Sequence, residues 1–273
     1  MVRRFLLLAA CLVLVAVPAS AQSIWLDREH RPSVLGEVLF PSFDGEDSTE
    51  FPTWTWFITG RFPVATSGAI VIEAPYAHGD FGDGEFSADG SIGNPYIGYE
   101  YRPHPSGLLL EAGARMPLME EELIPFLTGY FSDVDRQDAF VPDQLTLRLG
   151  LHYHHAASAD SRVSWDLRFV PTGWVVTDDD GDSFLEDSEL FFGYGGTVRY
   201  EGDAVRVGGG LGGRWNATND GADFGEASFH QFDLAADFLR GSVRPGLQLK
   251  LPLDDGLSNV VDMSWGVTLT VLP

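Results

Sequence analysis

Residues 145–154 read Leu-Thr-Leu-Arg-Leu-Gly-Leu-His-Tyr-His, and this stretch decides the fold. Apolar side chains occupy every odd position, whereas polar residues or glycine occupy every even position. Successive side chains of a β-strand point to opposite faces, so this alternation predicts a strand with one apolar and one polar face. Arg148, His152 and His154 therefore share the polar face.

The same period of two recurs in twelve segments of the chain. They lie near residues 34–40, 53–62, 68–76, 95–102, 108–116, 144–154, 162–171, 189–200, 205–215, 228–239, 243–251 and 260–272. No segment shows a sustained helical period, in which apolar residues would recur three and four positions apart. The sequence therefore predicts an all-β protein of about twelve strands.

The connections between these segments alternate between short and long. Those after the even-numbered segments are short, and those after the odd-numbered segments are mostly long. The long connections are residues 41–52, 77–94, 117–143, 172–188, 216–227 and 253–259. Together they hold 26 of the 40 Asp and Glu residues, and Arg136 is their only Lys or Arg. One end of the predicted sheet is therefore strongly acidic.

The composition excludes several classes of protein. Lys and Arg number 17 against 40 Asp and Glu, which gives a net charge of −23 at pH 7. We expect no nucleic-acid partner, because phosphates would be repelled by so acidic a chain. The single Cys excludes a disulfide-stapled fold. After the N-terminal segment, no apolar run approaches the ~18 residues of a membrane-spanning helix.

The N-terminus has the pattern of a secretory signal peptide. Arg3 and Arg4 precede an apolar run over residues 5–17, and Ala19-Ser20-Ala21 forms a small-x-small cleavage site. We expect residues 1–21 to be removed, which leaves residues 22–273 as a single domain without a thiol. Residues 8–11, which end in Cys11, also resemble a lipoprotein box, and lipidation there is the alternative.

The direction of the apolar face decides between a soluble and a membrane protein. Alternation alone does not settle it, but three features favour lipid. The polar face carries charges of both signs in mid-strand, aromatic residues of the apolar face gather near strand ends, and closure of the sheet would leave no exposed edges. The charged or titratable residues expected to line the lumen are Arg61, Glu100, Arg102, Glu111, Arg115, Arg148, His152, Asp166, Arg168, Arg199, Arg206, Arg214, Asp233, Asp237 and Arg244.

The signal peptide, the twelve alternating strands and the unequal connections resemble bacterial outer-membrane β-barrel proteins. In the last strand Ser264, Gly266, Leu269 and Val271 are similar to the pattern that such proteins present to the barrel-assembly machinery, although the chain ends in Leu-Pro and not in an aromatic residue. The resemblance implies a closed, antiparallel, up-and-down transmembrane β-barrel. It also implies a bacterial outer-membrane location, contact with membrane lipid and lipopolysaccharide, and a monomer.

One connection resembles a calcium-binding loop. Residues 178–189 follow the twelve-residue EF-hand spacing, in which oxygen ligands at fixed positions converge on one ion. The ligands would be Asp178, Asp180, Asp182, the carbonyl of Phe184 and Glu189. Ser183 stands where the motif has Gly, and the flanking segments are strands and not helices. The alternative is a solvated acidic loop without an ion.

A second set of residues could support hydrolysis. If the strands at 144–154 and 162–171 pair with His154 opposite Ser164 and His152 opposite Asp166, a serine, a histidine and an aspartate come together. The register is an assumption, and no oxyanion donor can be identified. The alternative is that His154, Ser164 and Asp166 are polar lumen residues.

These observations support three functions. The first is an outer-membrane channel for small solutes, since a twelve-stranded barrel encloses a narrow lumen. The second is a lipid-modifying enzyme, a hydrolase or acyltransferase, with calcium as a possible cofactor. The third is a structural surface barrel that conducts nothing. Conductance across a planar bilayer separates the first function from the other two.

Overall fold

A computed structural model describes residues 31–43, 53–80, 89–104, 107–156, 161–177, 187–219 and 222–273. The predicted signal peptide, residues 1–21, lies outside these ranges, so its cleavage stays a prediction. Within these ranges, no helix is both long enough and apolar enough to cross a membrane.

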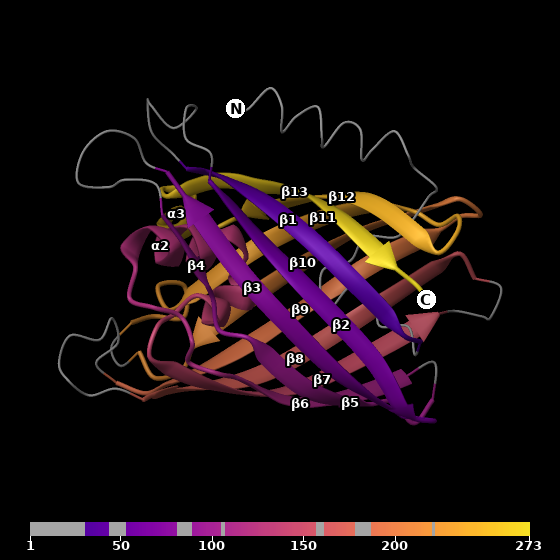
Figure 1. Ribbon diagram of the computed structural model, residues 1–273, viewed down its shortest axis with the longest axis horizontal. Coiled ribbons are helices and arrows are strands. Elements are labelled where there is room, and N and C mark those ends of the chain that lie inside the picture. The colour runs from indigo at the N-terminus through magenta and orange to yellow at the C-terminus, as the bar shows by residue number, and fades with distance from the viewer. Residues whose placement is uncertain are drawn as a thin grey trace.

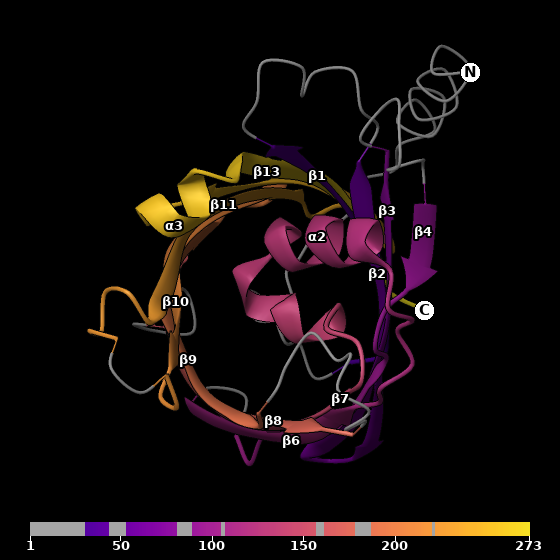
Figure 2. The ribbon, with the colours of Figure 1, turned by 90° about the vertical axis from the view of Figure 1, so that its left-hand side faces the viewer.

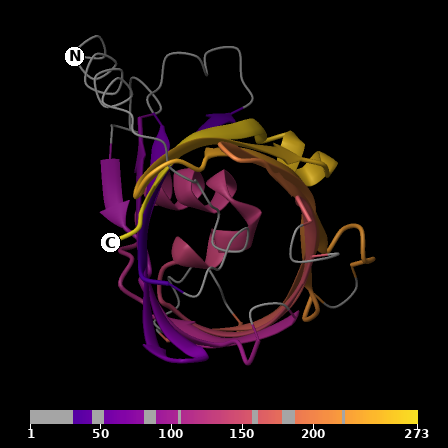
Figure 3. The same ribbon diagram turned by 90° about the vertical axis from the view of Figure 1, so that its right-hand side faces the viewer.

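Twelve strands form a closed antiparallel barrel (Figures 1 and 3). They are β1 (Ser33–Phe43), β2 (Trp54–Ala65), β3 (Gly68–Gly79), β5 (Tyr96–Tyr101), β6 (Gly107–Arg115), β7 (Gln144–Ala156), β8 (Val163–Val176), β9 (Glu189–Glu201), β10 (Val205–Asn216), β11 (Ser228–Phe238), β12 (Val243–Pro252) and β13 (Val261–Val271). Each strand pairs with the next of the twelve, and β13 pairs with β1 to close the ring. The prediction of a closed up-and-down barrel of about twelve strands is confirmed.

The apolar face of this sheet points outward. Leu149 is 61% exposed and Leu211 is 56% exposed, whereas Arg148 between apolar neighbours is only 7% exposed. Aromatic rings of the outer surface form clusters, such as the stack of Phe192 on both Phe169 and Trp215. A surface of this kind is typical of a barrel that faces lipid and excludes a soluble barrel with an apolar centre.

A thirteenth strand, β4 (Asp89–Ile92), was not predicted. The first half of β3 pairs with β5, and its last residues, 76–79, pair with β4. Both strands therefore have β3 as a neighbour. Residues 93–95 interrupt the two strands. Gly93 lies so close to the loop inside the barrel that a Cβ atom there would sit 2.3 Å from the Ala139 carbonyl oxygen. The interruption thus lets the backbone approach that loop.

The connection between β6 and β7 folds into the barrel (Figure 2). It contains α2 (Leu123–Ser132) and the 3-10 helix η2 (Val134–Ala139), and both lie within the ring of strands. A shorter helix, α3 (Asp255–Ser258), joins β12 to β13. The all-β prediction is confirmed, but these helices were not predicted from the sequence. The buried face of this helix includes the hydroxyls of Thr128 and Ser132, whereas Leu, Phe and Tyr side chains lie on the other face, so the apolar residues show no one-sided helical period.

The helices pack on a small apolar core inside the barrel. Phe140, which follows η2, is fully buried and meets Phe57 of β2 edge to face with 5.7 Å between ring centroids. Leu39 of β1 belongs to the same buried cluster. Gly129 allows the ring of Phe140 to approach α2, since a Cβ atom there would lie 2.1 Å from it. This cluster holds the loop against the wall formed by β1 to β3.

Candidate functional site: a lumen narrowed by the β6–β7 loop

The polar face of the barrel encloses a charged lumen. Twelve of the fifteen residues predicted to line it have buried side chains: Arg61, Glu100, Glu111, Arg115, Arg148, His152, Arg168, Arg199, Arg206, Arg214, Asp233 and Asp237. The other three, Arg102, Asp166 and Arg244, are partly exposed. Passage of a solute along these side chains stays a prediction.

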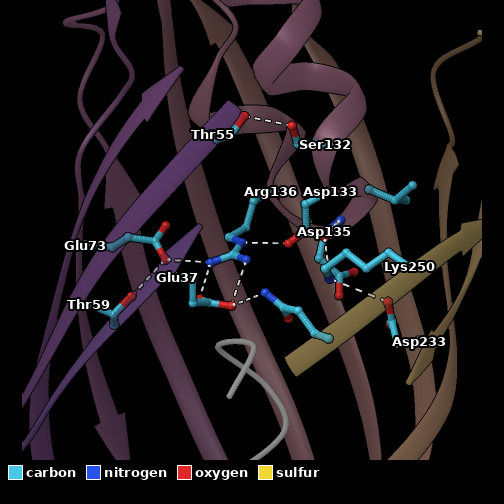
Figure 4. Close-up of polar contacts among 12 residues, drawn as sticks. Glu37, Thr55, Thr59, Glu73, Ser132, Asp133, Asp135, Arg136, Asp233 and Lys250 are labelled. Atoms are coloured by element: carbon cyan, nitrogen blue, oxygen red, sulfur yellow. Dashed lines mark hydrogen bonds and ion pairs between the residues drawn. The ribbon is translucent and has the colours of Figure 1, made fainter. Parts of the chain in front are cut away.

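Arg136 of η2 is the centre of the largest ion network in this lumen (Figure 4). Its Nη1 lies 2.6 Å from Glu37 Oε2 on β1 and 3.5 Å from Glu73 Oε2 on β3. Its Nε lies 2.7 Å from Asp133 Oδ2 in the same loop. The guanidinium also lies over the Phe57 ring, 3.6 Å from the centroid. One buried arginine thereby links the loop to two wall strands.

Lys250 of β12 binds the loop from another strand of the wall. Its Nζ lies 3.2 Å from Asp133 Oδ1 and 3.5 Å from Asp233 Oδ1 (Figure 4). Burial alone would raise the pKa of Asp133, but Lys250 and Arg136 outweigh burial and hold that pKa well below its ordinary value. Asp133 is therefore a carboxylate clamped between two cations.

A third anchor joins η2 to β6 and to the start of β5. Arg115 donates to Glu73 at 2.6 Å and to Asp138 at 3.2 Å. Asn94, which is fully buried, donates its Nδ2 to the Val141 carbonyl at 2.6 Å, and its Oδ1 accepts from the amide nitrogen of Met119 at 3.0 Å. The loop is held by its beginning, its middle and its end.

A narrow gap remains between η2 and the wall formed by β7 to β10. Its volume is about 20 Å³. The gap is lined by Val134, Asp135, Asp138, Arg148, Arg168, Val170, Thr172, Gly193 and Arg214. The wall supplies three arginines, and the loop supplies two aspartates. This gap is therefore small and is lined by charges of both signs.

The half of the lumen nearer the short turns is crossed by further ion pairs. Arg61 donates to Glu100 through Nε at 3.0 Å and through Nη2 at 3.2 Å. Glu111 accepts from the Tyr96 hydroxyl at 2.6 Å and lies 3.0 Å from His152 Nε2. The lumen between the loop and the short turns is therefore also lined by polar and charged side chains.

The assumed register of the candidate hydrolase residues is wrong. His154 pairs with Asp166, and Ser164 pairs with Ala156, two positions from the assumed partner. His154 Nδ1 lies 2.8 Å from Asp166 Oδ1, and Asp166 also accepts from Arg199. A histidine and an aspartate do meet, but the described hydrogen bonds of His154 run to Asp166 and Arg199 and not to the serine.

Most of the predicted calcium loop lies outside the described residues. Asp178, Asp180, Asp182 and Phe184 are not described, so calcium binding stays a prediction. Glu189, the twelfth position, accepts from Asn216 Nδ2 at 2.9 Å. In the part of the chain that the structure describes, no group of three or more His, Cys, Asp and Glu side chains could hold a metal ion.

Sequence reasoning missed the residues that fix the loop. Glu37, Glu73 and Lys250 lie on strands whose polar faces were recognised, but they were not among the predicted lumen residues. Arg136 and the aspartates of η2 were assigned to an external acidic rim. The lone base among 26 acids in the long connections was the available signal, because a single cation in such surroundings is a natural partner for several carboxylates.

Comparison with known proteins gives the fold alone. No family model matches the chain, and no curated protein matches it. Among solved structures, the COG4313 outer membrane channel from Pseudomonas putida F1 is 12% identical with a TM-score of 0.62, and the alignment covers 92% of this chain and 99% of that one. LpxR from Salmonella typhimurium is 7% identical with a TM-score of 0.54, covering 88% and 100% of the two chains. The NanC porin is 8% identical with a TM-score of 0.51, covering 89% and 99%. The chain has the fold of bacterial outer-membrane β-barrel proteins.

Proposed function

We propose that this protein is an outer-membrane channel for small polar solutes, narrowed by the β6–β7 loop. The observation that carries the proposal is the charged lumen around a loop held by ion pairs. Burying an ion pair contributes little to stability compared with apolar packing of the same volume. A barrel that only had to fill its centre would do so with apolar side chains, as the small cluster around Phe140 does locally.

The outward apolar surface supports the membrane location. Leucines and aromatic residues cover the strands outside, and the fold is shared with outer-membrane proteins. In this proposal the signal peptide directs export, the barrel-assembly machinery inserts the chain, and lipid and lipopolysaccharide surround it as a monomer. Calcium on residues 178–189 would bridge the acidic rim to anionic lipid headgroups.

Conductance across a planar bilayer tests the proposal. We expect the purified, refolded barrel to give small, discrete current steps, because the gap beside η2 is narrow. The same measurement on Arg136→Met, in which the loop has lost its central anchor, should give larger and noisier steps. If neither protein conducts although both show the heat-modifiable migration of a folded barrel, the channel is excluded and the structural role gains support.

A further inference from the structure

Arg214 is held unlike the other lumen arginines. Its side chain is 6% exposed, and its one ion contact among the described residues is long, 4.0 Å from Nη1 to Asp138 Oδ1. The guanidinium lies against two aromatic rings that contact each other, 4.0 Å from the Phe191 centroid and 4.4 Å from the Trp174 centroid. Its Nε and Nη2 are buried and have no hydrogen-bond partner in the described part of the chain.

Two buried donors without a partner call for an explanation. Leaving a buried donor unsatisfied costs about 1–3 kcal/mol, and more for a charged group. Nε and Nη2 form one edge of the guanidinium, and their two parallel N–H bonds match the two oxygens of a carboxylate. The edge of Arg214 is therefore suited to an oxyanion that the protein itself does not supply.

The surroundings of Arg214 favour an anion. Arg148 and Arg168 line the same gap, and Arg148 Nε is also buried without a hydrogen-bond partner among the described residues. Asp135 pairs with Arg168, Asp138 accepts from Arg115, and Glu111 lies 3.8 Å from Arg148 Nε, whereas Asp135 Oδ2 and Asp138 Oδ1 are buried without a hydrogen-bond partner among the described residues. The gap is thus lined by three arginines and two aspartates, and neither aspartate hydrogen-bonds to Nε or Nη2 of Arg214.

The gap has room for one small polar group at this point. Gly193 on β9 contributes no side chain, and the volume of about 20 Å³ exceeds the ~10–15 Å³ that one water needs. Thr172 adds a hydroxyl to the lining. One carboxylate oxygen is about as large as a water and could therefore take its place in the gap that Arg214 lines.

We propose that Arg214, with Arg148 and Arg168, forms a binding subsite for the carboxylate of a small anionic solute. The inference deepens the proposed channel by giving its solute class. Binding at the subsite does not require conduction, so the two ideas can fail separately. The rival explanation is that water alone satisfies Nε and Nη2.

Trifluoroacetate is a suitable probe, because its ¹⁹F signal broadens on weak binding. We expect the whole barrel in detergent micelles to broaden the signal beyond empty micelles, and excess acetate to reverse the effect. Arg214→Gln should reduce the acetate-reversible broadening at least fivefold. Arg214→Lys should retain only part of it, because an ammonium keeps the charge but loses the paired N–H edge. Arg162→Gln is the matched control and should behave as the wild type, since Arg162 is exposed and pairs with Asp203 at a short turn.

A second variant guards against misfolding of Arg214→Gln. Gly193→Leu fills the gap and keeps every charge, so it should also abolish the reversible broadening. Heat-modifiable migration confirms that each variant is folded. The inference is overturned if the wild type gives no acetate-reversible broadening, or if folded Arg214→Gln and Gly193→Leu broaden the signal as the wild type does. Binding without bilayer conductance would keep the subsite and reject the channel.

Discussion

Arg136 Nη1 lies 2.6 Å from Glu37 Oε2, although 99 positions separate the two residues in the sequence. Both side chains are almost fully buried. The pair joins a helix inside the barrel to the first strand of its wall, next to the β1–β13 contact that closes the ring. The loop is therefore anchored to one of the two strands that close the barrel.

Replacing Arg136 with Met should destabilise the barrel and release the loop. Glu37 would lose its cation and Asp133 one of its two while both stay buried, and breaking a buried pair in this way costs about 3–5 kcal/mol. We expect a loss of that order in the free energy of unfolding by urea, together with larger and noisier current steps. Arg162→Met is the control, and loss of its solvent-exposed pair should leave the free energy of unfolding nearly unchanged. An Arg136→Met barrel as stable as the control would show that the network does not anchor the loop.

The ion pairs that hold the loop should persist from neutral to acidic pH. The pKa of Asp138 is lowered, since Arg115 and Arg214 outweigh its burial, and the pKa of Asp133 is lowered by Lys250 and Arg136. A carboxylate whose pKa is lowered on folding contributes stability above its ordinary pKa of about 3.9, and this stability is lost only as pH falls through the lowered value. These two carboxylates should therefore produce no change in conductance between pH 7 and pH 5, and the loss should begin below pH 4.

The matched variant for this pH dependence is Lys250→Met. It removes one of the two cations on Asp133, so the pKa of that carboxyl should rise and loosening of the loop should begin at a higher pH than in the wild type. Current noise recorded in steps from pH 7 to pH 3 measures the onset. An onset at the same pH in both proteins would show that Asp133 does not control the loop.

The barrel could be predicted from the sequence, because one alternating pattern fixes both the strand and its two faces. The segment predicted at residues 205–215, for example, is β10 (Val205–Asn216) almost to the residue. The register between paired strands could not be predicted in the same way. A shift of two residues keeps every side chain on the same face of the sheet, so the alternating pattern does not distinguish the two registers. That is why His154 could be expected near an aspartate but was assigned the wrong partner. The helix α2 left no signal, because its buried face includes Thr128 and Ser132 while Leu, Phe and Tyr side chains lie on the other face, so it has no polar stripe.

Filling the gap beside η2 should block the channel. Gly193 lies on the inward face of β9, and a Cβ atom there would come no closer than 3.4 Å to the described neighbours. A leucine at this position should therefore be accommodated by the wall and project into a space of about 20 Å³. We expect Gly193→Leu to reduce single-channel conductance at least fivefold. The measurement is the current step at fixed voltage in the same salt.

Gly173 provides a matched control for this change. It lies on the outward face of β8, and no described atom lies within 4 Å of a Cβ atom built there. Gly173→Leu adds the same side chain to the lipid-facing side, so conductance should equal that of the wild type. Equal conductance in both variants would mean that ions do not pass beside η2 and would locate the path elsewhere in the lumen.

Calcium should bind to residues 178–189 with an affinity set by their spacing. We expect one ion with a dissociation constant of about 10⁻⁴–10⁻³ M, as in extracellular modules, because Ser183 replaces the turn glycine and Glu189 is shared with Asn216. Isothermal titration of the whole barrel with calcium chloride measures this. Asp180→Asn should weaken binding at least tenfold. Asp187→Asn removes the same charge from the tenth position, which supplies no ligand, and should change the affinity much less. Equal losses in the two variants would indicate diffuse attraction to an acidic loop and not a coordination site.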